Sequence, residues 1–313
     1  MEQTPVPCIN EHGYNYLFED DHNEMKRLLR IFLVISAMSG IHTALAADVL
    51  DTAVKLDDRL LPLLDNSFWI ADGNLPSKQI YVLAAPWCGV CQGLYKRITA
   101  DNRKRVQFRW VEMGGNDVTS DRQVAEAGVL RDVSLLKRMY VTVDPPNMVA
   151  GDDIEFVKRY QLAVARALKA AMKTTPLQDW GFPTLLWLSP KGLVAGHAPL
   201  SLSDLNKLID TVVPRPEAAE INPASSRILK ARSQWEPGPA PGNYTPIGDS
   251  VELFPFPDAS LPAEQVLERG HFYKAWRRSI TLDGVRWIEL KAYRDYPEGL
   301  FVRESEVKTV ILK

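Results

Sequence analysis

Hydrophobic and polar positions divide the 313-residue chain into regions with different periodicities. Residues 48–213 alternate between short apolar runs, which are typical of buried strands, and stretches with apolar residues every three or four positions, which are typical of helices. Residues 251–313 contain strand-like runs, and a proline-rich segment, 214–250, separates the two regions. The pattern predicts an α/β domain followed by a small all-β domain.

Strand-like runs of the first region predict one sheet. Residues 67–73 predict an edge strand that ends in an Asp72-Gly73 turn. Residues 80–85 are apolar throughout and predict the central strand, whereas residues 105–113 alternate polar and apolar side chains and predict a second strand. A strand-turn-strand unit is expected around Pro190-Lys191-Gly192, which lies between two further apolar runs.

Helix-like spacing separates these strands. The predicted helices cover residues 48–65, 92–98, 121–139, 152–172 and 201–213. The two long helices belong to a helical insert, 115–180, and are separated by the break Asp144-Pro145-Pro146-Asn147. The second helix is expected to be capped by Asp152-Asp153. This insert either covers the sheet or forms a cap beside a functional site.

The proline-rich segment and the region after it have a different character. Between Pro214 and Pro262 lie 10 of the chain's 22 prolines, so that residues 214–250 are expected to act as a semi-rigid linker. Beyond it, strands are predicted at residues 271–281, 285–290, 299–302 and 307–312, with an Asp283-Gly284 hairpin turn between the first two.

The strongest chemical signal is a pair of cysteines at the start of a helix. Cys88 and Cys91 follow the central strand and open the helix-like run, so that the two sulfurs lie one helical turn apart. The unpaired N–H groups at the helix start favour a thiolate on the first sulfur. We expect Cys88 to be the exposed nucleophile and Cys91 to be the resolving thiol that releases a mixed disulfide.

A zinc site is the alternative interpretation of two cysteines with this spacing. A structural zinc site needs a second pair of Cys or His ligands. The chain has one other cysteine, Cys8, and its five histidines have no ligand-like spacing. We therefore expect no metal and no cofactor, and we interpret the pair as redox-active.

A second motif, Gly181-Phe182-Pro183-Thr184, precedes the strand-turn-strand unit. Proline is tolerated at the first position of a strand, and an X-Pro bond is cis at much lower cost than other peptide bonds. The motif is therefore either an ordinary strand entrance or a cis-proline loop.

Taken together, Trp87-Cys88-Gly89-Val90-Cys91 and the later Pro183-Thr184 resemble the thioredoxin superfamily over residues 68–213. With the helical insert, the likeness is to the catalytic domain of the periplasmic Dsb disulfide isomerase branch. It implies a thioredoxin-like fold, a cis Pro183, and a substrate-binding surface formed by Trp87, Phe182, Pro183 and Thr184. Trp87 either covers the sulfurs or packs on the surface.

The same resemblance bears on redox poise. No histidine or proline lies between the cysteines, although such a residue is one way to make a pair strongly oxidising. Thioredoxin has a buried acid six residues before its first cysteine, and Val82 occupies that position here. The absence of both features indicates an intermediate redox potential that suits disulfide shuffling.

The last residues, 251–313, are similar to small barrels of the Src-homology type, and a β-meander is the alternative.

The N-terminal residues predict export. Lys26-Arg27 precedes an apolar run, 31–41, which is too short to cross a bilayer, and Ala44-Leu45-Ala46 has the small-x-small pattern of a signal-peptidase site. We expect translation to begin at Met25, residues 25–46 to be a signal peptide, and the mature protein to start near Ala47 in the periplasm. An uncleaved anchor is the alternative.

These features leave two classes of function. A net charge of −2 and a pI near 6.2 argue against a nucleic-acid partner. The first class is a periplasmic thiol–disulfide oxidoreductase or isomerase, with exported proteins carrying thiols or disulfides as substrates and a membrane redox partner. The second is an envelope assembly or binding protein of the secretion or conjugation type, in which the β domain docks an unknown partner.

Overall fold

The computed structural model describes residues 50–310, apart from gaps at 51, 116, 143–145, 147–150, 179–180, 199–200, 222, 224, 228–235, 238–241, 260–262, 283 and 291–298. Residues 47–313 form one compact unit. The predicted signal peptide lies outside the described residues, and its cleavage stays a prediction. Among the helices that are described, none is long and apolar enough to cross a membrane.

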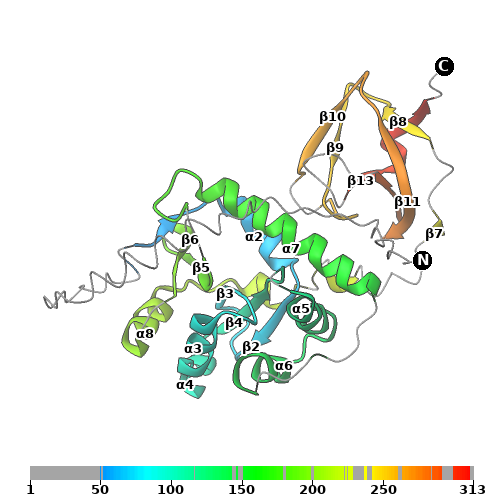
Figure 1. Cartoon of the computed structure of the whole chain (residues 1–313). Helices are drawn as coiled ribbons and strands as arrows, with labels where there is room; N and C mark the ends of the chain where they lie inside the picture. Colours follow the sequence, from blue (N-terminus) through cyan, green and yellow to red (C-terminus); the bar gives the residue numbers. More distant parts are fainter. Residues whose placement is uncertain are drawn as a thin grey trace, which may run out of the picture. The chain divides into compact units, whose positions relative to one another are not determined.

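A six-stranded sheet organises residues 54–197, in the order β1-β6-β5-β3-β4-β2 (Figure 1). Its strands are β1 (Val54–Lys55), β2 (Trp69–Asp72), β3 (Gln79–Ala84), β4 (Gln107–Glu112), β5 (Thr184–Ser189) and β6 (Gly192–His197). β3 runs parallel to β4, whereas the other pairs are antiparallel. The predicted central strand, edge strand and strand-turn-strand unit are therefore confirmed.

Alternation along β3 and β4 sends side chains to two separate cores. Ile80, Val82 and Trp110 belong to one hydrophobic cluster, together with residues of α3 (Gly89–Arg97), α6 (Ser134–Lys137), the π-helical turn η2 (Arg138–Thr142) and α8 (Leu202–Thr211). Tyr81 and Leu83 belong to another, together with residues of α2 (Leu61–Asp65), α5 (Val118–Leu130) and α7 (Gly151–Met172). The cysteine pair lies in the first cluster.

Two helix predictions were wrong in extent. Residues 54–55 of the expected helix 48–65 form β1, which pairs with β6, and a 3₁₀ turn η1 (Asp58–Leu60) follows. Pro62 lies in the first turn of α2 rather than at a helix end, because a first turn does not need its missing N–H. The parts of the expected helix at 48–49 and at 51 lie outside the described residues.

The expected helix 121–139 is divided into α5, α6 and η2. Arg131 ends α5 in the left-handed conformation, with φ of 53°, and its guanidinium donates to the Ser67 carbonyl at 2.8 Å. The Asp132 carboxylate then accepts from the Ser134 backbone N–H and starts the next turn. The contact of Arg131 with Ser67 thus accompanies a helix break that the spacing of apolar residues does not indicate.

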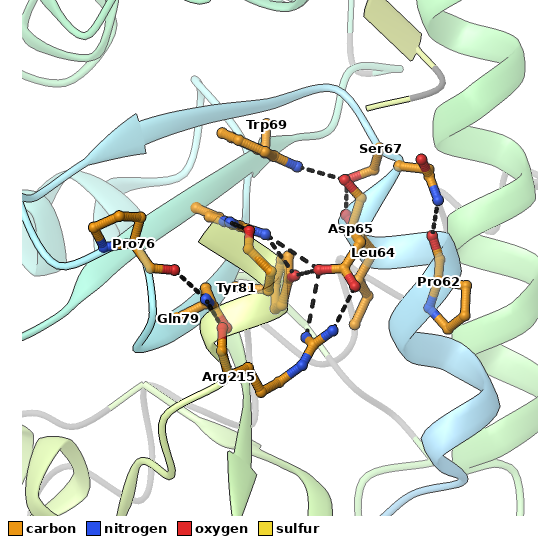
Figure 2. A network of polar contacts seen from close by, with 12 residues as sticks. Pro62, Leu64, Asp65, Ser67, Trp69, Pro76, Gln79, Tyr81 and Arg215 are labelled. Atoms are coloured by element: carbon orange, nitrogen blue, oxygen red, sulfur yellow. Dashed lines mark hydrogen bonds and ion pairs between the residues drawn. The ribbon is translucent and has the colours of Figure 1, made fainter. Parts of the chain in front are cut away.

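A buried polar network connects α2 to the sheet on the face away from the cysteines (Figure 2). The Asp65 carboxylate accepts from the Tyr81 hydroxyl, from Arg215 Nη2 at 2.7 Å and from Arg109 Nη1 at 3.2 Å. Trp69 donates its indole N–H to the Asp65 carbonyl at 2.9 Å. Asp65 and Arg109 are both buried, so one carboxylate compensates two guanidinium groups away from solvent.

The remaining described elements connect and complete these layers. They are α4 (Ala100–Arg105) and the 3₁₀ turns η3 (Pro216–Ala219) and η5 (Glu304–Glu306). In α4, Thr99 and Asn102 form a reciprocal capping box, in which each side chain accepts from the other's backbone N–H.

The C-terminal region is built from β-strands. One sheet has the strand order β13-β12-β11-β8-β14, with β7 paired to β11, and β10 and β9 form a separate pair. These strands are β7 (Glu236–Pro237), β8 (Asn243–Pro246), β9 (Ser250–Leu253), β10 (Gln265–Glu268), β11 (Tyr273–Leu282), β12 (Val285–Leu290), β13 (Leu300–Arg303) and β14 (Val307–Val310). The predicted hairpin and the two last strands are confirmed. Three of the unpredicted strands, β8, β9 and β10, have only four residues each. The choice between a Src-homology-like barrel and a meander stays open.

Contacts join the C-terminal strands to the long helix α7. The rings of Phe156 and Phe256 meet edge to face with centroids 5.2 Å apart, and Arg159 forms a buried ion pair with Glu289 at 2.6 Å. Within the proline-rich segment, Arg215 bonds to Asp65 and the Ser225 backbone N–H donates to Asn66. The division of the chain at 214–250 stays a prediction.

Candidate active site

Cys88 and Cys91 lie at the start of α3, immediately after the β3 strand. Cys88 is the N-cap residue of that helix, and its sulfur accepts a hydrogen bond from the Cys91 backbone N–H at 3.3 Å. Both thiols are free. The chain passes directly from β3 into the start of α3, and the N-cap position holds the Cys88 sulfur beside the backbone N–H groups of the first helical turn.

The two thiols differ in access to solvent. Cys88 is 9% exposed and Cys91 is fully buried. The sequence predicted an exposed Cys88, but the structure leaves only a small part of it open, with its thiol directed to the Phe182 carbonyl at 3.4 Å. Of the two cysteines, only Cys88 therefore keeps an exposed surface.

The second motif lies against the first, although the two are 94 residues apart in sequence. The Phe182–Pro183 peptide bond is cis, as the resemblance implied. Pro183 is buried, and its carbonyl accepts from the Ala198 backbone N–H at 3.3 Å. Pairing of β5 with β3 brings Thr184 opposite Leu83, which places the whole loop beside the cysteine helix.

Trp87 and Phe182 form the aromatic part of the site. Their rings meet edge to face with centroids 5.8 Å apart, and Trp87 is 46% exposed. Val90, between the cysteines, is 50% exposed. These apolar side chains form an open hydrophobic rim beside Cys88.

Thr184 occupies a different position from the other predicted substrate-binding residues. It is fully buried, and its hydroxyl donates to the Gly181 carbonyl at 2.6 Å. This bond closes the loop that carries Phe182 and Pro183, so the geometry favours a role for Thr184 in shaping the loop. A direct contact of Thr184 with substrate stays a prediction.

Burial decides the charge state of the inner thiol. Desolvation, with a smaller effect from the hydrogen bond to Cys88, raises the pKa of Cys91 well above that of an ordinary thiol. Cys91 is therefore protonated at neutral pH. It must lose its proton when it attacks a sulfur, because the thiolate is the nucleophile.

Two residues near this thiol were missed by the sequence analysis. Glu112, at the end of β4, is buried, and its Oε2 accepts a hydrogen bond from the Tyr140 hydroxyl of η2. Burial raises the pKa of Glu112 to about 8, while the bond from Tyr140 acts in the opposite direction. The one sequence feature that could have indicated Glu112 is its position at the end of a predicted strand that is adjacent to the central strand.

The raised pKa of Glu112 predicts a pH-dependent stability. Between its ordinary pKa of 4.5 and about 8, the folded state holds a proton that the unfolded chain has released. The free energy of unfolding should therefore be highest below pH 4.5 and should fall as the pH rises through about 8. Because one pKa unit corresponds to about 1.4 kcal/mol, the full effect is on the order of a few kcal/mol.

Urea unfolding at several pH values checks this prediction by comparison with Glu112→Gln. The glutamine keeps the size of the side chain and an acceptor for Tyr140, but it has no proton to lose. The difference in unfolding free energy between wild type and variant should change steadily across this interval. A difference that is independent of pH would show that folding does not change the pKa of Glu112.

Metal binding has no geometric support in the described part of the chain. No group of three or more His, Cys, Asp or Glu side chains is arranged there to hold an ion.

Comparison with known proteins gives structural neighbours only. No protein-family model and no curated protein matches the chain. A linker-deletion variant of Proteus mirabilis ScsC is 13% identical, with a TM-score of 0.35, and the match covers 63% of this chain and 96% of that one. A disulfide interchange protein from Neisseria gonorrhoeae is 17% identical, with a TM-score of 0.31 over 47% and 95% of the two chains.

A periplasmic thioredoxin-like protein from Salmonella enterica serovar Typhimurium is 14% identical, with a TM-score of 0.32 over 54% of this chain and all of that one. The fold itself is defined by the strand order of the six-stranded sheet and by the cysteine pair, which directly follows β3. By these features the chain has a thioredoxin-like α/β fold, with additional β-sheets in its C-terminal region.

Proposed function

We propose that this protein is a thiol–disulfide oxidoreductase that exchanges disulfides with exported proteins. The observation that carries the proposal is the asymmetry of the pair. Cys88 caps a helix and keeps a small accessible surface, whereas Cys91 is buried behind it. One sulfur is thus placed to attack a partner, and the other to resolve the product.

The surroundings of Cys88 support protein substrates. The open rim formed by Trp87, Val90 and Phe182 is apolar and adjoins the attacking sulfur. Such a rim can hold a segment of chain without demanding a particular sequence. Isomerisation and reduction begin with attack by Cys88 on a substrate disulfide, and oxidation is the reverse of the reduction. The reduction potential of the Cys88–Cys91 pair decides which of these reactions predominates.

Equilibration of the purified protein with glutathione buffers of graded composition tests the proposal. The expected result is a single two-electron transition that converts the Cys88–Cys91 dithiol into its disulfide, at a potential between those of strong oxidants and thioredoxin. The test uses a Cys8→Ser background, so that only the two site thiols react. A pair that forms no intramolecular disulfide at any ratio would refute the function.

We also propose that the protein acts in the periplasm, after cleavage near Ala47. The support is the basic segment, the apolar run and the Ala44-Leu45-Ala46 site in the sequence. N-terminal sequencing of protein recovered from the envelope of a bacterial host should begin at or near Ala47. Recovery of the uncleaved chain from the cytoplasm would contradict this prediction. Docking of a partner by the C-terminal strands remains an untested alternative.

A further inference from the structure

The resolving step needs a destination for a proton. Cys91 is fully buried, and its thiol is neutral at physiological pH. When Cys91 attacks a mixed disulfide at Cys88, its proton must leave from a site without direct contact with solvent. The strand position that carries a buried acid in thioredoxin holds Val82 here.

Glu112 is placed to fill this need from the neighbouring strand. In the parallel register of β3 and β4, Glu112 lies opposite Ala84, four residues before Cys88. Side chains alternate along β4, so Glu112 shares the face of Trp110, which belongs to the hydrophobic cluster that contains both cysteines. The carboxyl group of Glu112 is therefore on the cysteine side of the sheet.

The contacts of Glu112 leave one carboxylate oxygen available. Tyr140 donates to Oε2, whereas Oε1 is buried and has no hydrogen-bond partner in the described structure. The titratable groups that act on this cluster are Tyr140 from η2, and Cys91 and Cys88 from the start of α3. Tyr95 of α3 stacks on Tyr140 with ring centroids 5.6 Å apart.

The electrostatic influence runs between the carboxyl and the thiol. A charge on Glu112 opposes the ionisation of Cys91, and charges on Cys91, Cys88 and Glu112 oppose that of Tyr140. Neither a buried carboxylate nor a buried thiolate is well solvated. If a single proton is shared between the Glu112 carboxyl and the Cys91 thiol, one of these two groups is therefore neutral at every stage of the reaction.

We propose that Glu112 accepts the proton of Cys91 during resolution, a role that rests on the thiol–disulfide exchange proposed above. The Cys91 S–H bond breaks, the proton moves to Glu112, and a bond forms between Cys91 and Cys88. The bond from Cys88 to the substrate sulfur breaks, and the substrate leaves as a thiolate. The cysteine pair loses two electrons and the substrate disulfide gains them. In the reverse direction, Glu112 returns the proton to Cys91.

Tyr140 is a positioning residue in this scheme. Its hydroxyl holds Oε2 of Glu112 and leaves Oε1 without a hydrogen-bond partner in the described structure. The bond also favours the ionised carboxyl, so it lowers the pKa of Glu112. Loss of the Tyr140 hydroxyl should consequently shift the pH at which Glu112 becomes a proton acceptor upward.

Stopped-flow reaction of the reduced protein with the aromatic disulfide DTNB separates the two chemical steps. The full chain with Cys8→Ser is used. The first release of thionitrobenzoate reports attack by Cys88 and depends on DTNB concentration. The second reports resolution by Cys91 and is independent of that concentration. In the wild type, the second rate should rise with pH through an inflection near 8, where Glu112 ionises.

Glu112→Gln should slow the second phase by about 10²-fold, since positioned acid–base groups contribute at least this much, and should remove its inflection. The first phase should not change. Tyr140→Phe should keep the inflection but move it to higher pH. Glu289→Gln, which alters a buried glutamate in β12, is the matched control and should leave both phases as in the wild type.

A second phase with unchanged rate and inflection in folded Glu112→Gln would overturn the inference. Circular dichroism verifies folding, and if that variant is unfolded, an unmoved inflection in Tyr140→Phe overturns it instead. Failure of the proposed function gives a different result. In that case the wild type itself would show no second release, because Cys91 would not resolve the mixed disulfide at Cys88.

Discussion

Replacement of Cys88 by alanine should abolish thiol–disulfide exchange. Cys88 is the member of the pair with an accessible surface, and its sulfur accepts the Cys91 backbone N–H at the helix start. Cys91 alone is buried and protonated, so it cannot begin the reaction. Insulin reduction and repair of scrambled ribonuclease should both fall to the uncatalysed rate, measured in the Cys8→Ser background.

Cys91→Ala is the informative counterpart of this variant. It should keep the attack by Cys88 and lose only the resolution, so that mixed disulfides with envelope proteins accumulate and appear on non-reducing gels. Addition of dithiothreitol should release them. If the wild type itself shows no activity in either assay, the enzymatic function fails, and the fold would then act as a binding scaffold.

Asp65→Asn should strongly destabilise the folded protein. The carboxylate is buried and balances Arg109 and Arg215, and the Tyr81 hydroxyl also depends on it (Figure 2). The asparagine keeps the shape but leaves a fully buried guanidinium without its charge partner. Removal of one member of a buried ion pair costs about 3–5 kcal/mol, which chemical denaturation should show.

Asp57→Asn is the control for this substitution. Asp57 also pairs with an arginine, Arg59, but both side chains are largely open to solvent. Its replacement should leave the denaturation midpoint unchanged, because exposed ion pairs contribute little. Equal effects of the two substitutions would mean that the Asp65 network does not hold α2 to the sheet. The DTNB reaction of Asp65→Asn, in its folded fraction, should resemble that of the wild type, since the network lies on the other face of the sheet from the cysteines.

The elements closest to the candidate site were the ones that local sequence described best. An apolar run of six residues predicts β3, a cysteine pair follows it, and Ser201 caps α8 with a hydrogen bond from the Asp204 backbone N–H. Each of these signals is contained within a few neighbouring residues. The strands β8 and β9 lie in or directly after the proline-rich segment, where the abundance of proline indicated a linker, so neither was predicted.

Sequence by itself determined the candidate chemistry of this protein, since Cys88 and Cys91 after a buried strand, and a proline before another, predict the reacting sulfurs and the loop beside them. Only the tertiary structure decided their environment. The approach of Phe182 to Cys88 depends on the pairing of β5 with β3, and the position of Glu112 depends on the parallel register of β3 and β4. The break at Arg131 likewise coincides with a contact to Ser67, 64 residues away. Strand register and long-range contacts arise from the packing of segments that are distant in sequence, so no local pattern encodes them.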